Sequence, residues 1–240
     1  MIQERLNDAA ISLHRVLRRN KVSFGIFGGY AIGVLGGTRE SKDIDCLASA
    51  SKEQIISMMD KKDGFVLIPQ CRQDYVAFFW CGNPPEDRYP VLVEIFCERF
   101  PGSQHTMKCI KTGEHILSGQ QFGKGISCFF DPFHLFKGKL RAAATRSKSH
   151  DAEDLCWLAD RFGTTLKERS SELNLEYLRV AMERYPELEK MFRELNVDLA
   201  SVRNASDSLE LPCPSTLTPE ATLALEYTMA PGDVQFGLLG

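Results

Sequence analysis

Two aspartates separated by one isoleucine, Asp43 and Asp45, carry the clearest chemical signal in the sequence. On a β-strand, residues i and i+2 point to the same face, so we expect the two carboxylates side by side, with Ile44 facing the core. Adjacent carboxylates repel one another unless a cation lies between them. Mg²⁺ suits this place because it prefers oxygen ligands and often shares them with substrate phosphates. The alternative is an exposed acidic strand end without a metal.

A third carboxylate, Glu94, interrupts the otherwise apolar residues 90–96, which predict a strand. A lone carboxylate among Val, Leu, Ile and Phe needs a partner when it is buried. A position beside Asp43 and Asp45 would supply that partner through a shared cation. The alternative is an edge-strand glutamate that points to water.

A glycine pair, Gly28 and Gly29, follows the apolar residues 24–27 and precedes a short helical pattern that ends at further glycines. Glycine lets the backbone approach a ligand closely, and the start of a helix offers unpaired N–H groups to a phosphate. The pair therefore predicts a phosphate-binding turn. A turn that needs glycine for steric reasons alone is the alternative.

Together these features resemble the nucleotidyltransferase superfamily of the DNA polymerase β type. Its pattern is a GG or GS turn, a DxD or DxE strand, and a third carboxylate on a later strand. Here Asp43 stands 14 positions after Gly29 (43 − 29). Residues 38–42, TRESK, look like the TR-x-S-x-DID bridge of small bacterial-type members, and aminoglycoside nucleotidyltransferases and abortive-infection toxin types are the most similar groups. The resemblance covers roughly residues 20–160.

The resemblance implies an α/β fold, with a mixed-sheet polymerase β-like core followed by an α-helical C-terminal region. It implies three catalytic carboxylates that would hold two Mg²⁺ ions, with Mn²⁺ as a further option: Asp43, Asp45 and Glu94. It also implies five residues that would bind the NTP substrate: Gly28, Gly29, Arg39, Ser41 and Lys139. One departure is Glu94, since many relatives have Asp at the third position.

The second half of the chain adds a further match. Residues 135–155 look like the K-L-x-A…R…K-x-x-D-x-x-D-L segment that follows the catalytic domain in those relatives. By this resemblance Lys139 reaches the triphosphate, and nearby basic residues strengthen the positive field. A solvated basic helix face is the alternative for those neighbours. For Asp151 and Asp154 the sequence favours electrostatics at a helix start and pairing between helices over chemistry.

The elements that must position these residues fall into two halves. Strands and short helices alternate up to residue 130, and helical patterns dominate from Asp131-Pro132 onward, where an N-cap precedes proline at the first helical position. We predict a catalytic core over 1–130, a helical region over 131–203 and a C-terminal arm over 204–240. Helices are expected from 3 to 19, from the capping box of Ser51 and Gln54 to about 62, and from Ser149 to near Gly163. Between 105 and 130 we expect short strand-like pieces broken by glycine.

Composition excludes several classes of protein. The hydrophobic fraction is 43% and the charged fraction 25%, as in ordinary globular domains, so a disordered, collagenous or coiled-coil chain is excluded. No apolar run approaches the roughly 18 residues of a membrane helix, and the first residues show no secretory signal. The eight cysteines form no CxxC pair. They favour reduced thiols in a cytoplasmic protein, and Cys97, Cys128 and Cys156 lie in apolar runs that predict core positions.

The sequence thus favours an enzyme that moves an NMP from an NTP to a hydroxyl and releases pyrophosphate. The net charge of −3 argues against a long nucleic-acid track, so a small-molecule acceptor is favoured, while tRNA and protein acceptors stay open. A catalytically silent nucleotide-binding or scaffold protein with the same fold is the alternative. No GxxxxGK[ST] or GxGxxG motif supports another nucleotide-binding fold. The sequence assigns no membrane partner and no oligomeric state.

Overall fold

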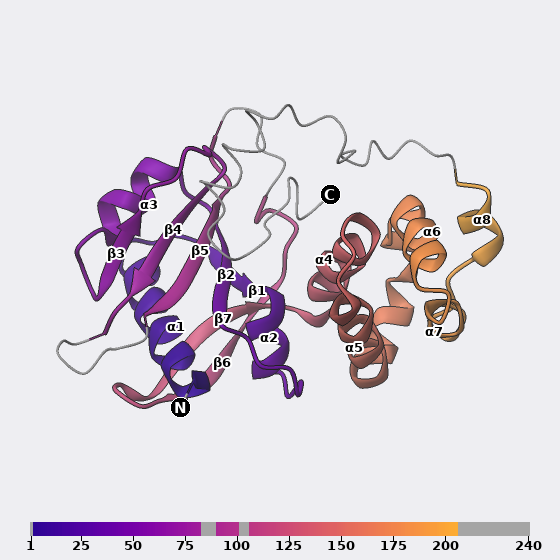
Figure 1. Cartoon of the computed structure of the whole chain (residues 1–240), viewed down its shortest axis with the longest axis horizontal. Helices are drawn as coiled ribbons and strands as arrows, with labels where there is room; N and C mark the ends of the chain where they lie inside the picture. Colours follow the sequence, from indigo (N-terminus) through magenta and orange to yellow (C-terminus); the bar gives the residue numbers. More distant parts are fainter. Residues whose placement is uncertain (1, 83–89, 101–105, 206–240) are drawn as a thin grey trace. The chain divides into compact units, whose positions relative to one another are not determined.

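The computed structural model describes residues 2–82, 90–100 and 106–205. The chain divides into two compact units, Met1–Asp131 and Pro132–Gly240. Figure 1 colours their described residues from indigo to magenta in the first unit and from rose to yellow in the second. The predicted division after residue 130 lies one residue from this boundary. Most of the predicted arm over 204–240 lies outside the described residues, which end at 205.

A seven-stranded mixed sheet organises the first unit. Its strands are β1 (Phe24–Phe27), β2 (Asp43–Ala48), β3 (Phe65–Ile68), β4 (Tyr75–Trp80), β5 (Val91–Cys97), β6 (Thr112–Gly119) and β7 (Gly123–Phe130). Their spatial order is β3-β4-β5-β2-β1-β7-β6. The pairs β2–β5 and β1–β7 are parallel and the others antiparallel. The mixed sheet expected from the resemblance is confirmed.

Three helices accompany this sheet: α1 (Ile2–Arg19), α2 (Gly28–Val34) and α3 (Lys52–Met59). Helix α1 buries its apolar stripe, including Leu6, Leu13 and Leu17, and contacts β2, β5, β6 and β7. The predicted capping box is present, because Ser51 and Gln54 exchange side-chain and backbone hydrogen bonds at the start of α3. That helix ends at Met59 rather than near residue 62.

The region from 105 to 130 differs from the prediction. In place of short pieces broken by glycine, β6 and β7 form one hairpin with eight residues in each strand. A Cβ on Gly119 would overlap the Asp8 side chain of α1, and one on Gly125 would come within 2.8–2.9 Å of Ile11. These glycines therefore allow α1 to pack closely on the hairpin, which explains why they do not break its strands.

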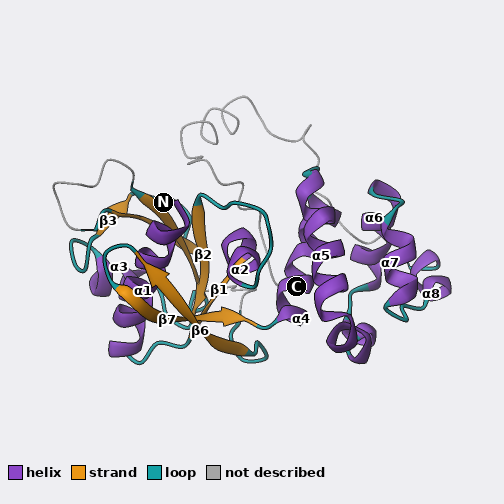
Figure 2. Cartoon of the chain, turned by 90° about the horizontal axis from the view of Figure 1, so that it is seen from below, coloured by secondary structure: helices purple, strands orange, loops and turns teal. Residues whose placement is uncertain are grey.

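In the described residues of the second unit, every secondary-structure element is a helix (Figure 2). It consists of α4 (Pro132–Thr145), α5 (Ser149–Glu168), the 3₁₀ turn η1 (Ser170–Glu172), α6 (Leu175–Arg184), α7 (Leu188–Glu194) and α8 (Leu199–Arg203). The predicted end of a helix near residue 163 appears as a kink, since Phe162 has φ −123° and ψ 22° and α5 continues beyond it. Across the described ranges, none of the helices combines the length and apolar character that crossing a membrane requires.

The cysteine prediction holds for two of three positions. Cys97 and Cys128 are buried, whereas Cys156 is exposed. The prediction for Cys156 is wrong because α5 turns Leu155 and Leu158 toward the core, and this leaves Cys156 on the solvent side of the helix. The seven cysteines of the described ranges are all free thiols.

Candidate active site

The register between β2 and β5 brings the three predicted carboxylates to one face of the sheet. Asp45 pairs with Glu94, and Asp43 pairs with Leu92 two positions earlier on β5. Because paired residues point to the same face, Asp43, Asp45 and Glu94 project together, and we call them the acidic trio. The aspartates are half-buried, and Glu94 is only 1% exposed.

The environment of Glu94 opposes its negative charge. Its Oε2 is buried and accepts no hydrogen bond from the described residues. Burial, followed by the charges of Asp45 and Asp43, raises the pKa of Glu94 to about 8, although Arg72 acts in the opposite direction. A cation beside this carboxylate would relieve both the missing hydrogen bond and the repulsion.

The acidic trio fits a hard divalent cation in donor type and charge. All its ligand atoms are carboxylate oxygens, which Mg²⁺ and Mn²⁺ accept, and one of them lacks a partner. Within the described ranges, no three His, Cys, Asp or Glu side chains are grouped closely enough to hold a metal ion as they stand. The trio therefore fits a cation in donor type and charge, and its side chains would have to converge to bind one.

Gly28 stands at the junction of β1 and α2, next to the acidic trio. Phe27 pairs with Asp45, so the chain leaves β1 beside that aspartate. Gly28 has a φ of +75°, and a Cβ at this position would overlap Oδ2 of Asp45. Glycine is thus required here both for backbone conformation and for the approach of the carboxylate.

Gly29 has a similar relation to Arg39 and Ser41. A Cβ on Gly29 would overlap the guanidinium of Arg39 and would lie 3.3 Å from the Ser41 hydroxyl oxygen. The structure therefore brings four of the five predicted nucleotide-binding residues together beside the acidic trio: Gly28, Gly29, Arg39 and Ser41.

The Ser41 hydroxyl already has a partner. Its Oγ donates a 2.9 Å hydrogen bond to Oδ1 of Asp43 and lies 3.3 Å from the Asp43 carbonyl oxygen. Ser41 is buried. The geometry therefore makes Ser41 a residue that orients an acidic side chain, and its predicted contact with phosphate remains a prediction.

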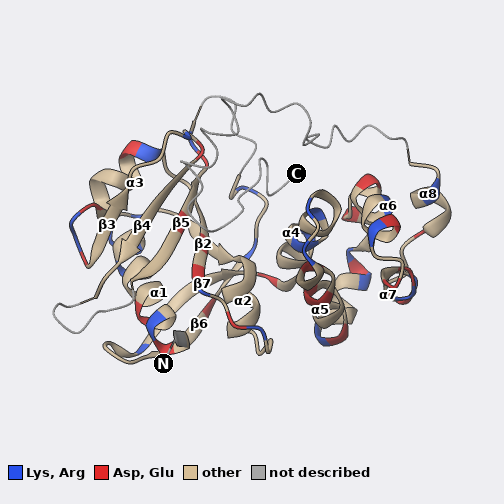
Figure 3. Cartoon of the chain, in the orientation of Figure 1, with Lys and Arg blue, Asp and Glu red and all other residues tan. Residues whose placement is uncertain are grey.

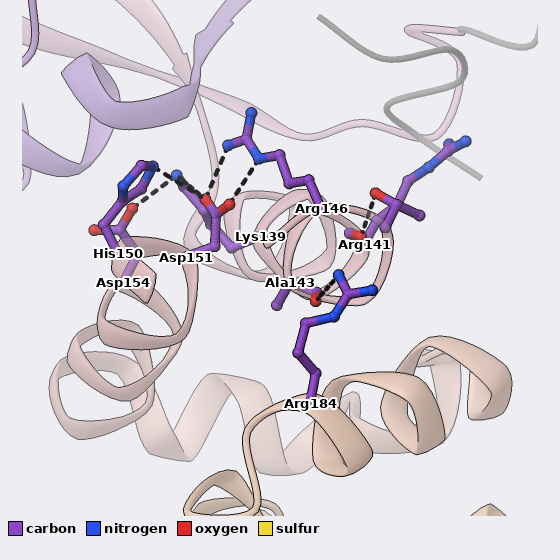
Figure 4. Close-up of polar contacts among 9 residues, drawn as sticks. Lys139, Arg141, Ala143, Arg146, His150, Asp151, Asp154 and Arg184 are labelled. Carbon is purple, nitrogen blue, oxygen red and sulfur yellow. Dashed lines mark hydrogen bonds and ion pairs between the residues drawn. The ribbon is translucent and has the colours of Figure 1, made fainter. Parts of the chain in front are cut away.

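Lys139, the fifth predicted nucleotide-binding residue, lies on α4 in the helical unit. Its side chain is 7% exposed, and Nζ forms ion pairs of 2.9 Å with Asp151 and 2.7 Å with Asp154 of α5 (Figure 4). Figure 3 shows the basic segments of α4 and the acidic segments of α5 that supply these charges. The predicted pairing of Asp151 and Asp154 between helices is confirmed. The predicted contact of Lys139 with a triphosphate is not tested by these distances.

Arg146 completes this buried network. Its Nε lies 2.7 Å from Asp151 Oδ2, and its Nη2 lies 2.9 Å from Oδ1. Burial by itself raises the pKa of Asp151, but the hydrogen bond from Arg146 and the charges of Lys139 and Arg146 outweigh it and lower the pKa to about 2. Asp151 is therefore held as a charged carboxylate in the interior.

Arg72 is a residue near the site that the sequence reasoning missed. Its Nε donates a 2.8 Å hydrogen bond to Asp74, and its guanidinium lies 4.5 Å from the ring centroid of Tyr75. Arg72 also lowers the pKa of Glu94, which places a positive charge within electrostatic reach of the acidic trio. Its only sequence signal is a position shortly before an apolar strand, which any surface arginine can occupy.

Comparison with known proteins gives the fold. No protein-family model and no curated protein sequence matches the chain. An antigenic nucleotidyltransferase-like protein from Paracoccidioides brasiliensis is similar in structure, with a TM-score of 0.58 and 16% identity over 83% of this chain and 97% of that one.

Two further structures are more distant. The lincosamide antibiotic adenylyltransferase LnuA has a TM-score of 0.39 and 12% identity over 61% of this chain and 91% of its own. ANT(2")-Ia in complex with adenylyl-2"-tobramycin has a TM-score of 0.39 and 14% identity over 81% and 94%. These two scores are too low to bear on fold or function. The likeness to the Paracoccidioides protein confirms the predicted fold: the chain has the fold of a nucleotidyltransferase-like protein.

Proposed function

We propose that this protein is a divalent-cation-dependent nucleotidyltransferase that moves an NMP from an NTP to a hydroxyl acceptor. The observation that carries the proposal is the pairing of Asp45 with Glu94, which sets a buried carboxylate with an unpartnered oxygen beside two half-buried aspartates. Such an arrangement costs folding free energy unless a ligand uses it. The likeness of the fold to a nucleotidyltransferase-like protein also supports the proposal.

The residues beside the acidic trio supply the other parts that phosphoryl transfer needs. Arg39 brings a guanidinium to Gly29, where it can donate to phosphate oxygens. Gly28 and Gly29 leave room for a triphosphate because they lack side chains. Ser41 holds Asp43 in one orientation through its hydrogen bond. These are positioning and electrostatic roles, which dominate catalysis of phosphoryl transfer.

The acidic trio would hold Mg²⁺, two ions by the resemblance, or Mn²⁺ in its place. When bound, such ions neutralise phosphate charge and lower the pKa of the attacking hydroxyl. A bond then forms between the acceptor oxygen and the α-phosphorus, and the bond from that phosphorus to the bridging oxygen breaks. Pyrophosphate leaves with the electron pair of that bond. The hydroxyl proton passes to a carboxylate of the trio or to water.

The acceptor that we favour is a small molecule bearing a hydroxyl group. The net charge of −3 gives no general attraction for a long polyanion. A tRNA end or a protein side chain remains an alternative acceptor that the same experiment tests.

The experiment measures transfer directly. Purified protein is incubated with Mg²⁺, each of the four NTPs and separate pools of small metabolites, total tRNA or protein. Pyrophosphate is quantified, and mass spectrometry detects the addition of an NMP. The test variant is Asp43→Asn/Asp45→Asn, and Glu40→Gln is the control because Glu40 is an exposed acid, three residues before Asp43, that lies outside the acidic trio. Transfer that is lost only in the test variant supports the proposal.

A silent nucleotide-binding protein is the alternative outcome. Calorimetry with a non-hydrolysable ATP analogue would then show Mg²⁺-dependent binding that the test variant loses, without transfer to any pool. If neither transfer nor nucleotide binding is detected, the proposal that the protein is an enzyme is refuted, and a scaffold role is left.

A further inference from the structure

We propose that three apolar residues on the face of the acidic trio, Leu92, Phe79 and Val66, form the subsite for an apolar, flat part of the acceptor. We call them the apolar row. This inference rests on the proposed function and deepens it, because it names the chemical class of the acceptor.

The sheet register defines the row. Asp43 pairs with Leu92 on β5, Leu92 pairs with Phe79 on β4, and Phe79 pairs with Val66 on β3. Directly paired residues share a face, so these side chains lie beside one another across four strands. Neighbouring strands are about 4.8 Å apart, which puts Phe79 about 10 Å from Asp43 along the row. A small molecule spans this distance.

Exposure distinguishes the row from its surroundings. Phe79 is 40% exposed, whereas the other five residues of β4 are buried. Val66 is 47% exposed. Leu92, which is 8% exposed, lies between Phe79 and Asp43 in the sheet. Two exposed apolar side chains at directly paired positions are neighbours rather than scattered surface residues, and contiguous apolar patches mark binding surfaces.

The geometry of the transfer reaction points to the acceptor as the occupant. In phosphoryl transfer, the attacking and leaving oxygens lie roughly in line on opposite sides of the phosphorus. The glycine pair and Arg39 lie on the β1 side of Asp45, where we propose that the pyrophosphate leaves. The attacking hydroxyl must then approach from the opposite side, which is the side of β5 and β4. The apolar row begins there.

The chemistry of the row indicates the class of acceptor. The three side chains of the apolar row carry no charge and no hydrogen-bonding group, so the row has no group that could pair with a polycation or hydrogen-bond to a polyol. An aromatic ring or a flat apolar ring system can stack on Phe79 and contact Val66. The expected acceptor therefore joins a hydroxyl, held at the acidic trio, to an aromatic or flat apolar part about 10 Å away.

The test compares matched acceptors and matched variants of the full chain. The probes are 4-phenylbutan-1-ol, the polyol glucitol and the polycation kanamycin, each with ATP and Mg²⁺. The test variant is Val66→Thr/Phe79→Thr, since threonine keeps the strand preference but removes the apolar surface. The control is Ile116→Thr/Ile126→Thr, which alters another exposed cross-strand apolar pair, on the β6–β7 hairpin.

We expect transfer to the aromatic alcohol with a lower KM than to the other probes. The test variant should raise that KM about tenfold, as loss of aromatic stacking and buried apolar area implies. It should leave kcat within about twofold and ATP binding unchanged, and the control variant should change none of these values. A KM for the aromatic alcohol no lower than for glucitol, or one unchanged in the test variant, would overturn the subsite.

Binding measurements separate this inference from the proposed function. Saturation-transfer NMR detects 4-phenylbutan-1-ol on the protein with Mg²⁺ and a non-hydrolysable ATP analogue, without any turnover. Binding that only the test variant loses, without transfer, would keep the subsite and refute the transferase. Transfer to glucitol without binding of the aromatic alcohol would keep the transferase and refute the subsite. A self-association that the test variant abolishes, with no binding of the alcohol, would assign the row to a second copy of the chain and also overturn the inference.

Discussion

Replacing Lys139 with methionine tests whether the ammonium of this residue stabilises the helical unit. The substitution keeps the unbranched apolar stem of the side chain but removes an ammonium that lies 2.9 Å from Asp151 and 2.7 Å from Asp154. The side chains of the three residues are 7%, 0% and 5% exposed, so solvent screens this network little. Removal of one partner from a buried ion pair costs about 3–5 kcal/mol, because the opposite charge stays in the interior. Arg146 still neutralises Asp151, so we expect the lower end, about 3 kcal/mol.

The two tryptophans allow the assay to follow this unit alone. Trp80 lies on β4 and Trp157 on α5, so a Trp80→Phe background leaves fluorescence from the helical unit only. Urea unfolding in that background should give a midpoint shift for Lys139→Met that corresponds to about 3 kcal/mol, and Asp154→Asn in the same chain should recover part of the loss. Lys190→Met is the control, since Lys190 is 84% exposed and lies 3.9 Å from Glu194. We expect no measurable change there.

One result would refute this reasoning about Lys139. If Lys139→Met unfolds at the wild-type urea concentration and instead weakens ATP binding tenfold, its ammonium serves the ligand rather than the fold. If stability falls and ATP binding is unchanged, the resemblance-based role at the triphosphate is wrong. A loss of both would show that the ion pairs hold Lys139 in place for a phosphate, since an ammonium has three N–H donors.

Three further predictions concern Gly29, Asp151 and Glu94. Gly29→Ala should weaken calorimetric ATP binding at least tenfold because its Cβ overlaps a guanidinium, whereas Gly138→Ala, with open space around the added atom, should leave binding intact. Asp151 has a folded pKa of about 2 against 3.8 unfolded, so its contribution of about 2 kcal/mol is present above pH 4 and is lost as pH falls toward 2. Acid unfolding curves should therefore be flatter over that range in Asp151→Asn, and an unchanged slope would contradict the assignment. Glu94→Gln should abolish transfer while the urea midpoint in EDTA stays level or rises, because the amide cannot ionise at a buried position where the fold disfavours a negative charge; a large fall in that midpoint would show that the charge stabilises the fold.

Local patterns predicted the parts of the site that depend on neighbouring residues. The alternation of Asp43, Ile44 and Asp45 fixed which side chains share a face, because a strand has a period of two. The capping box at Ser51 and Gln54 fixed the start of α3 for the same local reason. Glu94 was identified because a charged residue in an apolar strand needs a partner.

Contacts between distant segments explain what the sequence did not predict. The glycines of β6 and β7 indicated breaks, yet Gly119 and Gly125 meet α1, which lies over 100 residues earlier in the chain. The pairing of Ser41 with Asp43 depends on a side-chain rotamer that spacing does not specify. Phe79 lies in the apolar run of β4, where both faces carry hydrophobic side chains, so no periodicity distinguished the exposed face from the covered one.

The pairing of β2 with β5 shows how the proposed catalytic residues also specify the fold. A slip of one residue along β5 would turn Glu94 to the opposite face, where Val93 and Ile95 are fully buried. A carboxylate in that apolar layer would lose the neighbouring aspartates and any cation shared with them, so the slipped register carries a penalty that an all-apolar strand would lack. In the observed register Glu94 pairs with Asp45. Two residues earlier on the same strand, Leu92 pairs with Asp43 on one side and with Phe79 of the apolar row on the other. The observed register of β5 therefore places Leu92, and through their own pairings Phe79 and Val66, on the face of the acidic trio. This coupling gives a physical reason for the proposed acceptor subsite and the proposed metal site to lie on one surface.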